Sequence, residues 1–177
     1  MRIFFPTAGI PFAGHPTIGC AIHLAEAAAG TGDFERVVML EEEAGLVPVT
    51  VQRKGGVTLA ELIAPVLPHA VAGVRVDSAY LYSPGQGCDY QARMFSPTAG
   101  IPEDPATGSA SAILAAQLLA AGALDAGTTR LTLFQGIEMG RPSRIGLTIV
   151  RDGDALREVR VSGGAVSISS GQISAPG

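Results

Sequence analysis

Residues 93–114, R-M-F-S-P-T-A-G-I-P-E-D-P-A-T-G-S-A-S-A-I-L, set the architecture of this chain, because an imperfect copy of them stands at residues 2–25. In the first ten residues, R-I-F-F-P-T-A-G-I-P (2–11) and R-M-F-S-P-T-A-G-I-P (93–102) are identical at eight positions. The first copy then has two additional residues, after which H-P-T-I-G-C-A (15–21) aligns with D-P-A-T-G-S-A (104–110). The chain therefore contains two copies of one structural unit.

Each copy predicts the same local structure. A short strand (2–5 and 93–95) leads into a turn rich in proline and glycine, and X-Pro-x-x-Gly then opens a helix. Proline at the first helical position is already in a helical conformation. The two helices are expected at about 17–29 and 106–121, and both are apolar on nearly every side. Because a helix without a polar face is normally buried, each should be the centre of a half-domain.

The repeat predicts two lobes related by a pseudo-two-fold axis, with a cleft between them. If both helices begin at this cleft, their N-termini place unpaired N–H groups and positive dipole ends there. Such a cleft suits a ligand that carries a carboxylate.

The remaining sequence predicts an α+β fold made of two strand-rich half-barrels, each around its helix. Apolar and polar residues alternate in several segments, which we interpret as strands: 36–42, 46–53, 79–83, 129–134, 145–150, 156–161 and 166–169. Segment 57–63 fits a strand or a helix, and the acidic run 41–43 is expected to be a solvated strand end. We assign residues 64–77 to a link, the first lobe to 1–70 and the second to 71–177. No alternation of strands and helices demands a parallel sheet.

Composition excludes several classes of partner. The net charge is −4, with one lysine and eleven scattered arginines, so no basic stripe is available for nucleic acid. The longest apolar stretch, in the second helix, is too short to span a membrane. No secretory signal opens the chain, and we expect a cytoplasmic protein.

We predict no metal and no organic cofactor. Cys20 and Cys88 are far apart and show no C-x-x-C spacing, and no histidine, cysteine and acidic residues are spaced as metal ligands. Cys20 is expected to pack in the core. His23 is expected in the core or at the lobe boundary, and His69 in the link. The sequence contains no phosphate-binding glycine motif in a suitable context.

His15 and Asp104 occupy the same position in the two repeats, directly before the proline. Aspartate at this place is a common N-cap, so capping and packing explain Asp104 on their own. Histidine is a poor N-cap. If the lobes face each other, His15 and Asp104 lie on opposite walls of the cleft and form an acid/base pair able to move a proton on a bound carbon acid. Both interpretations remain open on the residues alone.

Three motifs resemble signatures of the PhzF-type phenazine biosynthesis isomerases: F-A-G-H-P-T-I-G (12–19), E-D-P-A-T-G-S-A (103–110) and Q-G-I-E-M-G-R-P-S (135–143). The resemblance implies a diaminopimelate epimerase-like fold and a homodimer. It also implies a biosynthetic, cofactor-independent proton transfer on a small cyclic carboxylate similar to dihydro-hydroxyanthranilate.

The resemblance also implies which residues line the site. The matching catalytic residues are His15, Asp104 and Ser109. The residues expected to bind substrate, by close backbone approach or as donors, are Gly14, Thr17, Gly19, Thr107 and Gly108. Gly19 and Gly108 serve helix packing equally well.

One family feature is missing. In the family, a glutamate ahead of the G-H-P motif moves the proton, and none of the fourteen residues before His15 is acidic. A truncated chain, a short form that no longer catalyses, and a short form that uses another acid all fit. Glu103 is the nearest substitute, although a solvent-facing role is the simpler interpretation.

Two other functions remain open. The chain could be an inactive relative that binds a small acid or acts as a subunit, with an exposed apolar surface that recruits a partner. It could also be an amino-acid epimerase or racemase of the same fold. Those enzymes use two facing cysteines, whereas the second unit here offers Ser109.

Overall fold

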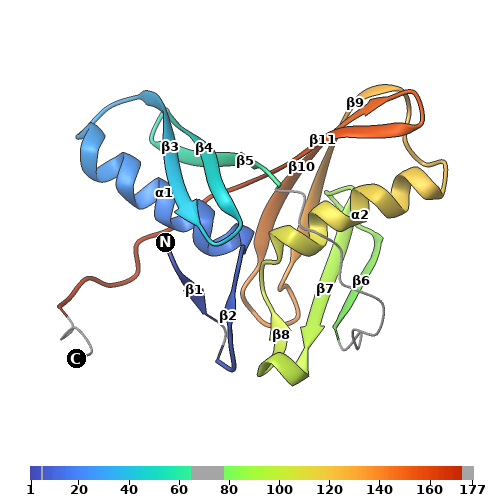
Figure 1. Ribbon diagram of the computed structural model, residues 1–177, viewed down its shortest axis with the longest axis horizontal. Helices are drawn as coiled ribbons and strands as arrows, with labels where there is room; N and C mark the ends of the chain where they lie inside the picture. The colour runs from blue at the N-terminus through green and yellow to red at the C-terminus, as the bar shows by residue number, and fades with distance from the viewer. Residues whose placement is uncertain (5, 65–77, 173–177) are drawn as a thin grey trace.

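The computed structural model describes residues 1–4, 6–64 and 78–172 (Figure 1). In this part of the chain the elements are, in order, β1 (Ile3–Phe4), β2 (Gly9–Ile10), α1 (Gly14–Ala29), β3 (Phe34–Glu42), β4 (Gly45–Lys54), β5 (Val57–Ile63), β6 (Ala79–Pro84), β7 (Tyr90–Ser96), a 3₁₀ turn (Pro97–Ala99), β8 (Ile101–Asp104), α2 (Gly108–Ala120), β9 (Gly127–Gln135), β10 (Ser143–Asp152) and β11 (Ala155–Gly163). The predicted α+β class is confirmed.

The two copies contribute equivalent three-strand parts, β3–β5 and β9–β11, to one large sheet, which β6–β8 extend on the side of the second copy, while β1 and β2 form a separate two-stranded sheet. The order of the large sheet is β3-β4-β5-β11-β10-β9-β7-β6, with β8 paired to β7. Three strands follow each helix, and the last strands of the two copies, β5 and β11, pair antiparallel at the centre of the sheet. Figure 1 shows α1 along one half of this sheet and α2 along the other. The arrangement agrees with the pseudo-two-fold relation predicted from the repeat.

Each helix is preceded by a hairpin built from the same residues. β1 pairs with β2, and β7 pairs with β8, in both cases antiparallel across the P-T-A-G segment. The two hairpin tips touch, because the Thr7 hydroxyl donates a hydrogen bond of 3.3 Å to the carbonyl of Ala99. The repeated units therefore face each other at their turns.

One continuous core joins the two halves. Its strand residues are apolar at alternate positions, which places them on the sheet face that meets the helices. The main contributors are Val47, Val49, Val51, Leu62, Leu133, Ile145, Leu147, Ile149 and Val161 from the sheet, Ile18, Ala21, Ile22 and Ala25 from α1, and Leu114, Ala115 and Leu118 from α2. Fully burying one such leucine or isoleucine contributes about 1.5–3 kcal/mol.

The helices differ from prediction in two respects. Each buries one face only, since Leu24 on α1 is 46% exposed and Ile113 on α2 is 62% exposed. Neither helix starts at its X-Pro proline. Pro16 is the third residue of α1, where its missing N–H is still harmless, and Pro105 precedes α2 by three residues. Asp104 is therefore the last residue of β8 and not an N-cap.

Most strand predictions are confirmed, and the ambiguous segment 57–63 is a strand. Residues 166–169 are not a strand, because no neighbouring strand offers them a partner, and Val166 and Ile168 are each 83% exposed. His23 is exposed and does not lie in the core. The link prediction (64–77), the lobe boundary at residue 70 and His69 lie almost entirely outside the described residues.

The acidic run 41–43 is not fully solvated. Glu42 is only 6% exposed, because the alternation of β3 turns it towards α1, where Thr17 Oγ1 donates to Glu42 Oε1 at 2.7 Å. The second oxygen, Oε2, is buried and has no hydrogen-bond partner among the residues that the structure describes. Burial raises the pKa of Glu42.

No helix in the described ranges is long and apolar enough to cross a membrane.

Candidate active site

The N-termini of the two helices meet at a pair of glycines. A Cβ built on Gly14, the first residue of α1, would lie 3.3 Å from the Cα of Gly108, the first residue of α2. A Cβ on Gly108 would lie 3.2 Å from Val161 Cγ1 on β11. Side chains at these two positions would push the helices apart. The glycines thus bring both positive helix ends to one place.

A cavity of about 890 Å³ opens at this meeting point. Gly14, His15 and Ile18 line it from α1, and Pro105, Ala106 and Gly108 line it from the entry to α2. The opposite walls come from residues 141–145, just before and at the start of β10, and from residues 161–166, at and after the end of β11. Its size suits a small ring compound with a carboxylate.

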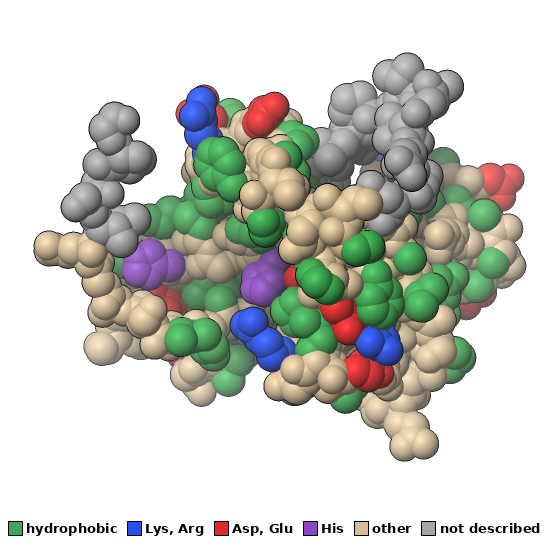
Figure 2. Space-filling model, turned by 90° about the horizontal axis from the view of Figure 1, so that it is seen from below, with side chains coloured by type: hydrophobic (Ala, Val, Ile, Leu, Met, Phe, Trp, Pro, Cys, Tyr) green, Lys and Arg blue, Asp and Glu red, His purple; other side chains and the backbone are tan. Residues whose placement is uncertain are grey.

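The charges around the cavity favour an anion. His15, Arg141 and Arg144 line it, and none of the three side chains makes a hydrogen bond or ion pair within the part of the chain that the structure describes. The lining carboxylate Glu26 is paired with Arg53 at 3.0 Å. Figure 2 views the molecule from below and shows, near the middle of that face, a histidine side chain next to a basic side chain. The cavity therefore presents unneutralised basic groups beside two helix N-termini.

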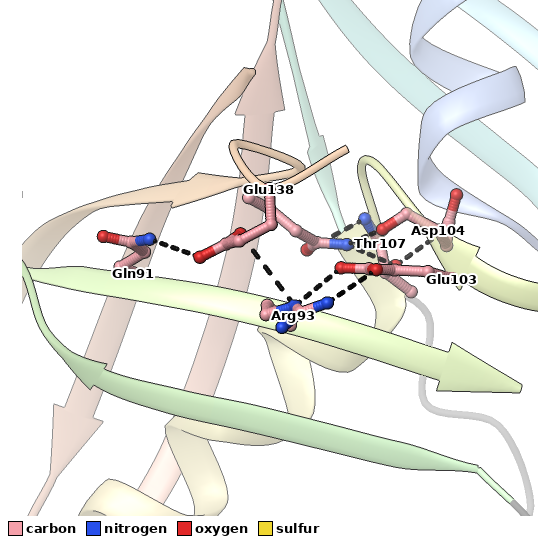
Figure 3. A network of polar contacts seen from close by, with 7 residues as sticks. Gln91, Arg93, Glu103, Asp104, Thr107 and Glu138 are labelled. Carbon is pink, nitrogen blue, oxygen red and sulfur yellow. Dashed lines mark hydrogen bonds and ion pairs between the residues drawn. The ribbon is translucent and has the colours of Figure 1, made fainter. Parts of the chain in front are cut away.

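Asp104 does not itself line the cavity, but it directly precedes the lining residue Pro105. Its carboxylate oxygen Oδ2 accepts a hydrogen bond of 2.5 Å from the Thr107 hydroxyl. Thr107 in turn accepts a hydrogen bond from the fully buried side chain of Gln135, the last residue of β9. Figure 3 shows Asp104 and Thr107 close together beside this network.

A second set of contacts fixes the strand that carries Asp104. Arg93 on β7 binds both carboxylate oxygens of Glu103, each at 2.8 Å, and lies 3.9 Å from Glu138. Gln91 donates to Glu138 at 2.8 Å (Figure 3). Hydrogen bonding to Arg93 lowers the pKa of Glu103. Glu103 is consequently a half-buried, ionised partner of arginine, not the solvent-facing residue expected, and it is poorly suited to replace the missing acid.

Four of the other expected site residues do not line the cavity: Thr17, Gly19, Thr107 and Ser109. Ser109 is the second residue of α2 and half-buried. Gly19 lies in the second turn of α1 and has no neighbour within 4 Å of a built Cβ. Thr17 is completely buried, and its hydroxyl contacts Ala13 O and Glu42 Oε1, both at 2.7 Å. Thr17 therefore belongs to the core and leaves no donor for a ligand.

The sequence analysis missed Gln135, Arg141 and Arg144 as site residues. All three lie in or beside the Q-G-I-E-M-G-R-P-S segment that carried part of the family resemblance. Gln135 ends a strand in which polar and apolar residues alternate, and it is followed by a glycine with φ of 77°. A glutamine at a core-facing position of that alternation, directly before such a turn, was the available signal.

Comparisons with known proteins agree with this fold. A family model described as "Phenazine biosynthesis-like protein" (PhzC-PhzF) matches residues 1–79 and 69–171. An uncharacterized isomerase of Mesorhizobium japonicum is 30% identical over 240 residues, covering 98% of this chain and 79% of the relative. A trans-2,3-dihydro-3-hydroxyanthranilate isomerase of Pseudomonas chlororaphis is 29% identical over 223 residues, covering 98% and 78%.

Solved structures show the same fold at lower identity. The PhzF-family phenazine biosynthesis protein of Bacillus anthracis superimposes with a TM-score of 0.71 at 16% identity, over 96% of this chain and 78% of that one. A hydroxyproline epimerase of Agrobacterium vitis superimposes with a TM-score of 0.60 at 14% identity, over 90% and 65%. The predictions of the fold and of the isomerase class are both supported. The match of the family model along nearly the whole chain, together with the related isomerases, shows that this chain belongs to the phenazine biosynthesis-like (PhzC-PhzF) protein family.

Proposed function

We propose that this chain is an isomerase that moves a proton between two carbons of a small cyclic carboxylate of the dihydro-hydroxyanthranilate type, without a cofactor. The observation that carries the proposal is the meeting of two helix N-termini and His15 at one cavity of about 890 Å³. The names of the related isomerases support the class of reaction.

The first turns of the helices hold the substrate carboxylate. Their N–H groups have no partner within the helix and point towards the cavity end of each helix. Gly14 and Gly108 carry no side chain that would keep a ligand away from this backbone. Ser109, in the first turn of α2, adds a hydroxyl donor. Arg141 and Arg144 add positive charge on the opposite wall.

His15 carries the proton. As a neutral imidazole it takes a proton from one ring carbon, while the substrate carboxylate and the helix ends stabilise the negative charge that develops. The imidazolium then returns a proton to a second carbon, so that no electrons or atoms are gained or lost overall. Asp104, which directly precedes the lining residue Pro105, is the partner group whose carboxylate stabilises the imidazolium.

Solvent deuterium incorporation followed by NMR tests the proposal. Dihydro-hydroxyanthranilate and related cyclic carboxylates are incubated in D₂O with the unaltered chain, His15→Ala and Asp104→Asn. We expect exchange that falls by at least about 100-fold in His15→Ala, since a positioned acid/base group contributes that much. His23→Ala is the matched control, because His23 lies on the same helix, is exposed and does not line the cavity.

Two outcomes would replace the proposal. Binding of the small acids without any exchange would identify an inactive relative that uses the same cavity. Exchange at the α-carbon of an amino acid would identify an epimerase, although neither Cys20 nor Cys88 lines the cavity as a facing thiol. The homodimer remains a prediction that sedimentation velocity tests, and the cytoplasmic location remains a prediction for cell fractionation.

A further inference from the structure

The side-chain amide of Gln135 forms hydrogen bonds to both ends of the turn that carries Asp104. Its side chain is fully buried at the end of β9. Gln135 Nε2 donates to the carbonyl of Asp104 at 2.7 Å, and Gln135 Oε1 accepts from the N–H of Thr107 at 3.3 Å. One amide group therefore closes the segment 104–107 at its first and last residues.

These backbone partners fix the orientation of the amide. A backbone carbonyl can only accept and a backbone N–H can only donate, so exchanging Oε1 and Nε2 of Gln135 would oppose like groups at both contacts. The second N–H of Nε2 is consequently directed at Thr107 Oγ1, at 2.9 Å. The Thr107 hydroxyl accepts this bond, which leaves its own proton to be donated.

The donated proton goes to Asp104. Thr107 Oγ1 lies 2.5 Å from Asp104 Oδ2, and an ionised carboxylate oxygen can only accept. With Asp104 ionised, the hydrogen bonds therefore run in one direction, from Gln135 to Thr107 to Asp104. This arrangement keeps Oδ2 as an acceptor and leaves Oδ1, which makes no hydrogen bond within the described residues, as the oxygen available to another group.

Gly136, the residue after Gln135, packs closely against the same turn. Gly136 has φ of 77°, and a Cβ built on it would lie 2.9 Å from the carbonyl oxygen of Pro105 and 2.5 Å from that of Arg141. Only glycine allows the end of β9 to approach the turn this closely. The contact restricts Pro105 and Arg141, both of which line the cavity.

We propose that Gln135 is a positioning residue which, through Thr107, directs a hydrogen bond onto Asp104 Oδ2 and thereby leaves Oδ1 as the oxygen that stabilises the His15 imidazolium. Gln135 does not line the cavity. The inference rests on the proposed function only for its kinetic consequence. Its structural content, a one-way hydrogen-bond chain that controls one carboxylate, stands independently of turnover.

Five variants separate this role from simple packing. Gln135→Met keeps the volume and removes both polar groups, and Thr107→Val keeps the shape and removes the hydroxyl. Thr107→Ser keeps the hydroxyl and is the conservative rescue. Gln91→Met is the matched control, because Gln91 belongs to the neighbouring network at Glu138 and has no bond to the segment 104–107. Asp104→Asn provides the background in which the chain has no carboxylate to act on.

Two readouts decide the matter. In deuterium exchange, Gln135→Met and Thr107→Val should lower kcat about 10–100-fold with KM changed by less than about twofold, and neither should lower it further in the Asp104→Asn background. Thr107→Ser and Gln91→Met should stay within about threefold of the unaltered chain. Equal losses in Thr107→Val and Thr107→Ser, or losses that add to that of Asp104→Asn, would overturn the inference.

The second readout needs no activity. The ¹³C resonance of the Asp104 carboxyl, assigned by its loss in Asp104→Asn, should move in Gln135→Met and Thr107→Val and stay in place in Thr107→Ser and Gln91→Met. If the unaltered chain shows no exchange, the proposed function fails and this resonance alone decides the positioning role. A resonance that is unchanged in both Gln135→Met and Thr107→Val would overturn it.

Discussion

Replacing Gly14 with alanine tests whether the two helix N-termini really meet. The added Cβ would lie 3.3 Å from Gly108 Cα and 3.7 Å from the Gly108 carbonyl carbon, whereas ordinary contacts begin at 3.4 Å. These neighbours are backbone atoms and cannot rotate away. The helices must therefore separate by a few tenths of an ångström, which also disturbs the contact between Gly108 and Val161.

The cost can be set against a matched substitution in the same helix. Overpacking of this kind costs about 1–3 kcal/mol. Gly19→Ala introduces the same methyl group five residues later, where nothing lies within 4 Å, and it should stabilise the chain by about 0.5–1 kcal/mol through helix propensity. The two variants should thus differ by about 1.5–4 kcal/mol in the free energy of unfolding, which is several degrees in Tm.

Urea unfolding followed by circular dichroism measures this difference, and the midpoint and slope show whether the transition remains two-state. Binding of benzoate to the cavity, measured by calorimetry, should weaken in Gly14→Ala and persist in Gly19→Ala. A Gly14→Ala chain that is as stable as Gly19→Ala and binds benzoate normally would show that the helices do not converge, and the shared site would be lost.

Three further predictions concern charged groups. Because burial raises the pKa of Glu42 above its ordinary value of 4.5, the neutral acid stabilises the fold at low pH, and this contribution is lost as pH rises through the raised pKa. Glu42→Gln should therefore be more stable than the unaltered chain by about 1–2 kcal/mol at pH 7 and by little at pH 4, as measured by thermal melts. Arg93 lowers the pKa of Glu103, so this ion pair stabilises the folded state above about pH 4.5 and loses that effect as pH falls. Arg93→Met should therefore reduce the loss of stability between neutral and acid pH. An unchanged dependence of stability on acid pH would contradict a role of this pair. The affinity of the cavity for benzoate should decrease as ionic strength rises, because basic groups without a partner among the described residues line the cavity. The affinity should also be lower in Arg141→Gln than in the unaltered chain. Binding that does not depend on salt would refute this electrostatic account.

Much of the fold follows from local sequence. Alternating apolar residues identified most of the strands, and the repeat identified both helices and the relation between them, because these signals depend only on residue periodicity. His15 was proposed in the same way, as a repeat position next to a helix start, whereas Gly14 and Gly108 were expected from the family resemblance. The prediction failed at residues 166–169, where the alternation is present but no neighbouring strand supplies hydrogen bonds.

The candidate site depended more on long-range contacts. Gln135 is thirty-one residues from Asp104, and only the order of the sheet brings the end of β9 against the segment 104–107. Thr17 carries the same hydroxyl donor as Thr107, yet it lies on the face of α1 that meets Glu42 of β3 and is therefore in the core. No local pattern distinguishes these two threonines.

The segment P-T-A-G-I-P separates most clearly what the sequence determined from what the tertiary structure decided. The sequence by itself determined that both copies turn between two short strands, since proline and glycine restrict the same positions in each. The tertiary structure decided the form of each turn: Gly100 ends a 3₁₀ turn with φ of 76°, whereas Gly9 lies in a strand. The physical reason is that β7 is held inside the large sheet by β6 and β9, whereas β1 and β2 pair only with each other within the described residues, so identical residues pack against different neighbours.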